Sequence, residues 1–200
     1  FVVMKADPTQ PASFTSEELR GTIGMFAFHD ITSFDVAVAE GDSIVVNGDA
    51  PMFSGCQKVK TINLVGLDLT EVTSMDSMFY YCNALTSIAF PESYGQNATS
   101  TKEMFSNCVV LKTLDLSGMD TSKVEDMTKM FENCGNLKTL DLSGFDTSNV
   151  QTMENMFCYC YDLESLDVSS FNTSQVIKMR YMFCGCFALE ELDVTSFDTS

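Results

Sequence analysis

Hydrophobic side chains recur along the chain with a period of 26 residues. A Met-Phe pair stands at each step from Met52-Phe53 to Met182-Phe183, and a cysteine follows four residues after each of these methionines. The positions seven, ten and twelve residues after each Met are apolar in all six copies. A fixed period of this kind predicts a stack of repeats, because one copy cannot bury its apolar side chains without its neighbours.

One copy can be divided into a strand, a turn and a short helix. Residues 137–142 end in alternating apolar and polar positions, which is typical of a short, half-buried strand. Ser143-Gly144 predicts a turn, and the oxygens of Phe145–Ser148 can accept hydrogen bonds from free backbone N–H groups. Apolar residues then follow at helical spacing, at Val150, Met153, Met156 and Phe157. Stacked copies would place their strands in a parallel sheet, ~4.8 Å apart.

The predicted fold is an α/β solenoid of about six to seven coils of 26 residues, with a parallel sheet on its concave face and short helices or turns on its convex face. Regular repeats occupy residues 52–200. Residues 25–51 are predicted to be a degenerate first coil, in which His29 replaces the cysteine, and residues 1–24 an N-terminal lead-in and cap, with a loop and a cap helix. Pro91 cannot donate to a sheet ladder, so we expect a break just after the strand that precedes it.

The repeated motif resembles that of a known family. The run Met-Phe-x-x-Cys-x-x-Leu-x-x-Leu-Asp-Leu-Ser-x-Phe-Asp-Thr-Ser-x-Val extends from Met130 to Val150 and returns, with two substitutions, from Met156 to Val176. It resembles the BspA-like leucine-rich-repeat surface proteins, and the resemblance covers roughly residues 52–200. The resemblance implies a secreted or cell-surface protein, mostly of bacteria that live with a host, that binds other proteins or cells. It implies no particular ligand, because a shared fold is only an analogy for function.

The charge of the chain limits its partners. Its 28 Asp and Glu residues against 11 Lys and Arg residues give a formal net charge of −17. Such a surface repels phosphate backbones and anionic lipids, which argues against nucleic acid and membrane partners and favours cationic or hydroxyl-rich partners or bound cations. No apolar run approaches the ~18 residues that a membrane span needs. Because the chain begins at Phe1 and stops within a repeat at Ser200, we interpret it as a piece of a longer protein.

The eight cysteines are predicted to be free thiols. Residues in register on adjacent parallel strands keep their Cβ atoms ~4.8 Å apart, longer than the ~3.8 Å that a disulfide prefers, so the six cysteines of the 26-residue ladder should act as small buried apolar residues. Two additional cysteines, Cys158 and Cys184, leave two alternatives open. One is a disulfide between them, and the other is a four-thiolate zinc site formed with Cys160 and Cys186. We expect no metal and no cofactor.

Three columns of side chains lie between the buried positions of the predicted sheet. The first column holds Thr61, Ser87, Thr113, Thr139, Ser165 and Glu191. The second holds Asn63, Ala89, Asp115, Asp141, Asp167 and Asp193, and the third holds Val65, Pro91, Ser117, Ser143, Ser169 and Thr195. A neighbouring column changes sign, from Lys60, Lys112 and Lys138 to Glu164 and Glu190. The concave face should therefore become more acidic toward the C-terminal coils.

These columns are where the sequence predicts binding. The candidate residues are Asp115, Asp141, Asp167, Asp193, Thr113, Thr139, Ser165, Glu191, Ser117, Ser143 and Ser169. The strip could recognise a protein, possibly a host extracellular or cell-surface protein, or a glycan. It could also bind calcium weakly, or be a solvated consensus without a partner. Stacked aspartates repel one another, so solvent, hydroxyl donors or cations must relieve that repulsion.

No arrangement typical of catalysis is present in the sequence. The chain has one histidine, no Ser-His-Asp ordering and no glycine-rich phosphate loop, so we expect no enzymatic activity. The sequence therefore predicts a monomeric, non-catalytic recognition module, extracellular or at the cell surface, that binds through its concave sheet. The alternative is a structural spacer that presents another domain.

Overall fold

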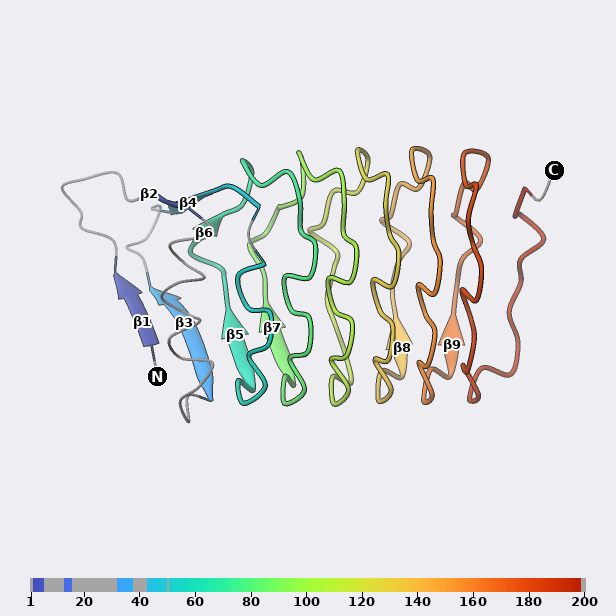
Figure 1. The fold of residues 1–200 in the computed structure, drawn as a ribbon, viewed down its shortest axis with the longest axis horizontal. Helices are drawn as coiled ribbons and strands as arrows, with labels where there is room; N and C mark the ends of the chain where they lie inside the picture. The colour runs from blue at the N-terminus through green and yellow to red at the C-terminus, as the bar shows by residue number, and fades with distance from the viewer. Residues whose placement is uncertain (1, 6–12, 16–31, 38–42, 50, 199–200) are drawn as a thin grey trace.

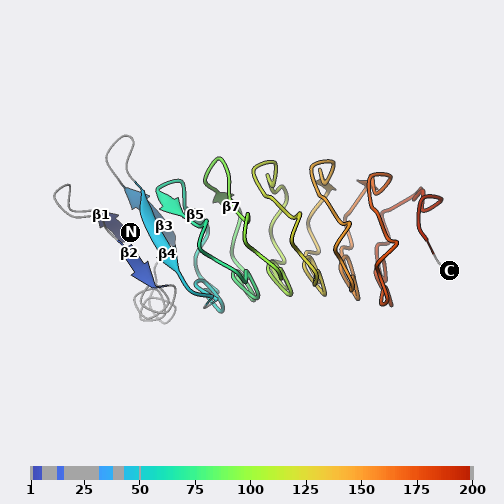
Figure 2. The same cartoon turned by 90° about the horizontal axis from the view of Figure 1, so that it is seen from above.

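The coils of the chain lie side by side in one row, as Figure 1 shows along the long axis and Figure 2 from above. The computed structural model describes residues 2–5, 13–15, 32–37, 43–49 and 51–198. Its strands are, in chain order, β1 (Val2–Lys5), β2 (Ser13–Thr15), β3 (Ser33–Ala37), β4 (Ile44–Asn47), β5 (Thr61–Asn63), β6 (Leu67–Asp68), β7 (Ser87–Ala89), β8 (Thr139–Leu140) and β9 (Ser165–Leu166). The strands are short because each coil contributes only a few residues to each wall of the stack.

Strands of successive coils pair in parallel. One sheet has the order β1-β3-β5-β7, a second has the order β2-β4-β6, and β8 pairs with β9. Ile62 lies opposite Ile88 in the first sheet, and Leu140 lies opposite Leu166 in the third. Both pairs differ by 26 in residue number, so the predicted register and the parallel direction of the strands are confirmed.

The short helices predicted for the convex face are wrong. Turns replace them, and the residues that the structure describes contain no helix. The Met78 N–H donates to the Met75 carbonyl at 3.3 Å within one coil, whereas the Ser77 N–H donates to the Lys102 carbonyl of the next coil at 2.8 Å. Ser77 and Tyr81 have φ angles of 54° and 59°, in the left-handed region that a right-handed helix excludes. Hydrogen bonds between coils therefore hold this wall together.

The Met and Phe columns form the core, as their spacing predicts. Met52, Met78, Met104, Met130 and Met156 are each at most 2% exposed. The phenylalanine rings from Phe53 to Phe183 stack in five consecutive pairs, with centroids 5.3 to 5.7 Å apart and ring planes within 9° of parallel. Offset stacking of this kind stabilises aromatic pairs beyond the burial of their surface. The core is thus a continuous column that passes through every coil from residue 52 onward.

The cysteine ladder lies beside this column, and all eight cysteines of the chain are free thiols. From Cys82 onward, each ladder thiol donates to the backbone carbonyl of the phenylalanine 29 residues earlier, at 3.1 to 3.3 Å. Burial raises the pKa of Cys56 to about 11 and that of Cys134 to about 12, so both thiols stay neutral. The cysteines therefore link neighbouring coils through weak hydrogen bonds, a role that their spacing alone does not indicate.

The N-terminal coils depart from the regular repeat. β1 and β2 lie within the predicted lead-in, residues 1–24, where they pair with β3 and β4 of the first coil, residues 25–51. The expected cap helix and His29 lie outside the described residues, so the boundaries between these segments stay a prediction. β7 ends at Ala89, just before Pro91, where the sequence predicts an interruption of the sheet.

Candidate binding face

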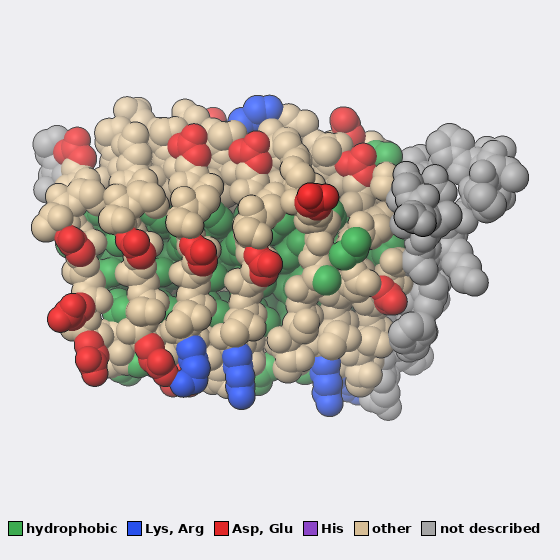
Figure 3. Space-filling view, turned by 180° about the vertical axis from the view of Figure 1, so that it is seen from behind, with side chains coloured by type: hydrophobic (Ala, Val, Ile, Leu, Met, Phe, Trp, Pro, Cys, Tyr) green, Lys and Arg blue, Asp and Glu red, His purple; other side chains and the backbone are tan. Residues whose placement is uncertain are grey.

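The eleven side chains predicted to form the binding face are all exposed. We call this set the acidic face; it comprises Thr113, Asp115, Ser117, Thr139, Asp141, Ser143, Ser165, Asp167, Ser169, Glu191 and Asp193. Figure 3 shows a row of acidic side chains running across consecutive coils on this side of the molecule. The parallel register brings these side chains together, because it places each aspartate beside its counterpart 26 residues on.

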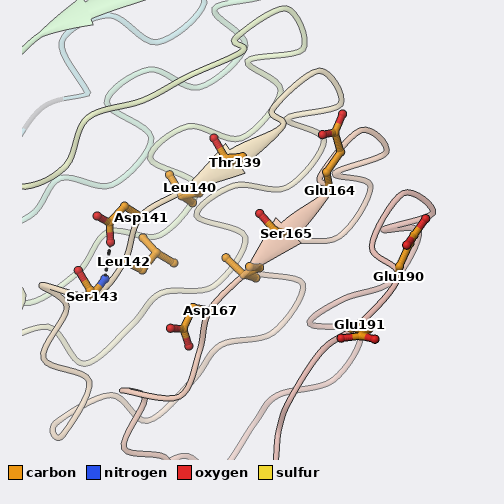
Figure 4. Close-up of a pocket in the computed structure, with 11 residues that line it drawn as sticks. Thr139, Leu140, Asp141, Leu142, Ser143, Glu164, Ser165, Asp167, Glu190 and Glu191 are labelled. Atoms are coloured by element: carbon orange, nitrogen blue, oxygen red, sulfur yellow. Dashed lines mark hydrogen bonds between the residues drawn. The ribbon is translucent and has the colours of Figure 1, made fainter.

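A hollow of about 630 Å³ opens on the acidic face over the coils that carry β8 and β9 and the coil that follows them, which contributes Glu190 and Glu191. Figure 4 shows Thr139 and Ser165 side by side on the two strands, with Asp141 and Asp167 further along the same coils. Leu140 and Leu166 also line it and are 6% and 8% exposed. The hollow therefore combines hydroxyl groups and carboxylates with a little apolar surface.

Each aspartate of the acidic face also closes a turn of the backbone. The Ser143 N–H donates to Asp141 Oδ1 at 3.0 Å, and the same bond recurs at Asp115, Asp167 and Asp193 at 2.9 to 3.0 Å. The backbone and side-chain hydrogen bonds from Ser143 lower the pKa of Asp141. The aspartates are therefore ionised at neutral pH, and they have a structural role besides any role in binding.

The charge along one edge of the acidic face changes sign, as the sequence predicts. Lys138 Nζ lies 2.6 Å from Glu164 Oε1, and both side chains are more than half exposed. Exposed ion pairs of this kind contribute little to stability, because water screens them. Toward the C-terminal coils, Glu190 continues the edge and is exposed, as is Glu191 in the column beside it. Figure 3 shows the basic side chains giving way to acidic ones along this edge.

A buried column of threonines, which the sequence analysis did not predict, holds the second turn of three successive coils, at Thr121, Thr147 and Thr173. Thr147 is 1% exposed; its Oγ1 donates to the Asn172 carbonyl at 3.0 Å and accepts from the Asn172 N–H at 2.8 Å. Thr121 makes the same two bonds to the backbone of Asp146. The recurrence of threonine at this position is the signal in the sequence, because a solvated turn would not need the same residue in successive copies.

The extra cysteines do not form a metal centre in the part of the chain that the structure describes, where no group of three or more His, Cys, Asp or Glu side chains is arranged to hold a metal ion. Buried Cys158 and exposed Cys184 lie on neighbouring coils as free thiols. Burial, followed by a hydrogen bond with the Cys184 thiol, raises the pKa of Cys158 to about 12.

Across residues 2–5, 13–15, 32–37, 43–49 and 51–198, no helix is long and apolar enough to cross a membrane.

Comparisons with known proteins agree with this architecture, and together they define a leucine-rich-repeat protein. Residues 12–126 match the family described as "BspA type Leucine rich repeat region (6 copies)", and residues 99–200 match "Mycoplasma protein of unknown function, DUF285". The chain belongs to the BspA type leucine-rich-repeat family and, through its C-terminal half, to the second family. Neither the curated proteins nor the solved structures include a match to it. Leucine-rich repeats of this family generally mediate protein interactions.

Proposed function

We propose that this chain is a non-catalytic recognition module, extracellular or at the cell surface, whose acidic face binds a basic surface of a partner protein. The observation that carries the proposal is the row of four exposed aspartates on consecutive coils. Identical groups at a fixed spacing on a rigid stack allow one partner to contact several of them at once.

The electrostatics of the acidic face favour a cationic partner. The aspartates carry negative charge at neutral pH. Hydrogen bonds from Ser169 lower the pKa of Asp167, while the charges of Asp193 and Asp141 act on it in the opposite, weaker sense, which shows that the neighbouring carboxylates repel one another. A partner that brings positive charge would relieve this repulsion between neighbouring coils. Complementary charge also speeds association and makes it sensitive to salt, because exposed charges are screened within ~8 Å at physiological ionic strength.

The hydroxyl groups beside the aspartates add the means for hydrogen bonding. Thr139 and Ser165 lie on neighbouring strands next to the hollow of about 630 Å³, whose volume matches that of a small binding cleft. A lysine or arginine side chain of a partner can place its stem over the leucines of the hollow and its charged end against the carboxylates. The proposal therefore rests on shape as well as charge.

The test compares two pairs of substitutions that remove equal charge. In the variant Asp141→Asn with Asp167→Asn, the amide oxygen can still accept the turn hydrogen bond, so the charge is lost and the turn is kept. The matched control is Asp120→Asn with Asp146→Asn, because these aspartates close the same kind of turn with Ser122 and Ser148 and do not belong to the acidic face. Binding of an oligolysine peptide is measured by calorimetry at several salt concentrations.

The proposal predicts that the pair on the acidic face weakens binding and reduces its salt dependence, while the control pair has a much smaller effect. Equal weakening by the two pairs would mean that only the net charge of the chain attracts the peptide, and would refute the proposal.

A second function, a structural spacer that presents another domain, is favoured by one observation. The aspartates of the acidic face all accept turn hydrogen bonds from their own backbone, so their recurrence has an explanation without a partner. A spacer predicts that neither pair of substitutions changes peptide binding. It also predicts that Asp141→Ala, which removes the turn acceptor, lowers the melting temperature of the chain.

A further inference from the structure

Two cysteines lie outside the regular ladder, on the last two coils that the structure describes. Cys158 is buried, with 3% of its surface exposed, whereas Cys184 is exposed. They occupy the same position of consecutive repeats, 26 residues apart, and their thiols form a hydrogen bond. The pair therefore combines one thiol that dissolved molecules can reach with a second thiol that lies beneath it.

Side chains at this position of the repeat reach their counterparts in the next coil. Ser106 and Glu132 occupy the two preceding copies of the position, and Ser106 Oγ donates to Glu132 Oε2 at 3.3 Å. The column therefore brings polar atoms of neighbouring coils into contact distance. In the last two copies these atoms are the sulfurs of Cys158 and Cys184.

The backbones of the two coils approach closely beside the thiols. The Tyr159 N–H donates to the Cys184 carbonyl at 2.6 Å. Gly185 permits this approach, because a Cβ atom added there would lie 2.8 Å from the Tyr159 ring. Parallel rungs ~4.8 Å apart fall within the ~4.4–6.8 Å between Cα atoms across a disulfide, although their Cβ atoms would have to move ~1 Å closer.

The ladder cysteines on the same two coils are held in a different direction. The Cys160 thiol donates to the Phe131 carbonyl at 3.2 Å, and the Cys186 thiol donates to the Phe157 carbonyl at 3.1 Å. Each of these sulfurs is thus directed toward the backbone of the preceding coil. Cys158 and Cys184 are instead directed toward each other, since their thiols share a hydrogen bond.

We propose that Cys158 and Cys184 form a redox site, which a small-molecule disulfide of the glutathione class oxidises to a disulfide bond between the two coils. The inference goes beyond the proposed function, because it requires no partner protein. It concerns the same two coils, however, since Asp167 on one and Glu190 on the other line the hollow of about 630 Å³. The bond would therefore hold two sides of that hollow together.

The reaction consists of two thiol–disulfide exchanges. The Cys184 thiol gives its proton to water, and its thiolate attacks one sulfur of the small disulfide, so that a mixed disulfide forms and a small thiolate leaves and takes up a proton. Cys158 then loses its proton to water and attacks the Cys184 sulfur, which forms the new bond and releases the second small thiolate, again to be protonated. Two cysteines are oxidised, and one small disulfide is reduced to two thiols.

The order of the two exchanges follows from the surroundings of the two thiols. Cys184 is exposed and meets the oxidant first. Burial, and then the hydrogen bond and the charge of Cys184, raise the pKa of Cys158 to about 12, so Cys158 is a poor first nucleophile. The two effects of Cys184 end once its sulfur is part of the mixed disulfide, which makes Cys158 easier to ionise for the second exchange.

The experiment incubates the whole chain, with its thiols reduced, with glutathione disulfide. The products are alkylated in denaturant and examined by mass spectrometry. The variants are Cys184→Ser, which changes an exposed side chain, and Cys158→Ser, which changes its buried neighbour. The matched control is Cys186→Ser, because Cys186 lies two residues from Cys184 but belongs to the ladder, and a serine hydroxyl can still donate to the Phe157 carbonyl.

The proposal predicts that the chain loses the mass of two hydrogen atoms, and that two of its eight cysteines are no longer alkylated. Peptide mapping should place the bond between Cys158 and Cys184, and dithiothreitol should restore both thiols. Cys186→Ser should form the same bond, whereas Cys184→Ser should keep its remaining thiols. The oxidised chain should also melt at a higher temperature than the reduced chain, because the bond closes a loop in the unfolded state.

Three results would overturn the inference: eight free thiols after the incubation, a mixed disulfide at Cys184 that persists with glutathione attached, or a bond from Cys158 to a ladder cysteine. The Cys184→Ser variant keeps the test decisive if Cys158→Ser fails to fold. These outcomes are separate from those of the oligolysine experiment, because neither cysteine belongs to the acidic face.

Discussion

The buried threonine column leads to a prediction whose size can be worked out from the structure. Thr147→Val replaces the hydroxyl group by a methyl group of similar shape, so the packing around residue 147 is kept. The substitution removes two hydrogen bonds to the backbone of Asn172, of 2.8 and 3.0 Å. At ~1 kcal/mol of net stability for each bond, the free energy of unfolding should fall by ~2 kcal/mol.

The assay is urea unfolding followed by circular dichroism, with thermal melting as a second measurement. For a chain of this length, a loss of ~2 kcal/mol corresponds to a fall in melting temperature of ~4–8 °C. Thr139→Val is the matched control, because the same atoms change at an exposed position of β8, where the effect should be below ~0.5 kcal/mol. If Thr147→Val costs no more than Thr139→Val, the threonine column does not hold neighbouring coils together, and this part of the reasoning is refuted.

Three further predictions concern the core, the aspartates and the thiols. Leu140→Asp should unfold the stack in a melting experiment, because it buries a charge between coils. Thr139→Asp should change the melting temperature little, and similar melting curves for the two variants would contradict the register. Hydrogen bonds lower the pKa of Asp141 and Asp167 in the folded chain, so their stabilising effect is present above the unfolded pKa of ~3.9 and is lost as the pH falls through the lower folded value. Acid unfolding should therefore start below pH ~4, and Asp141→Asn with Asp167→Asn should make the loss less steep; an unchanged acid transition would count against these bonds. Under native conditions an alkylating reagent should modify exposed Cys184 first and leave buried Cys108 and Cys134 intact. All eight cysteines should react in denaturant without reductant. Disulfides found by mass spectrometry would contradict the free-thiol ladder.

The period of the sequence predicted the register and the core, because both depend on the same repeated apolar columns. The helices were predicted wrongly, since apolar residues three positions apart also fit a series of turns whose N–H groups bond three residues back. The signal in the sequence that favours turns is the type of residue at the positions with positive φ angles, among them Asn107, Asn133 and Asn155. Asparagine is enriched at positive φ, and a recurring Asn favours a turn over a helix.

For the candidate binding residues, the sequence could predict that their side chains are exposed, but not the contacts that they make. Alternation along the strand predicts which side chains face solvent, and the structure agrees for the row from Asp115 to Asp193. It does not reveal that each aspartate closes a turn with the residue two positions later. The close approach of the Gly118 backbone to the Glu92 carbonyl was also out of reach, because it depends on how two neighbouring coils pack against each other.

The most direct test of the recognition account is to map where a basic peptide binds. The ¹⁵N-labelled chain is titrated with an oligolysine peptide, and the shifts of its backbone amide signals are followed. The account predicts that the largest shifts fall within residues 113–117, 139–143 and 165–169, and that they diminish as salt is added. Shifts concentrated instead on the turns at residues 153–159, on the opposite wall, or a chain whose amide signals do not move, would contradict the claim that the acidic face is the binding surface.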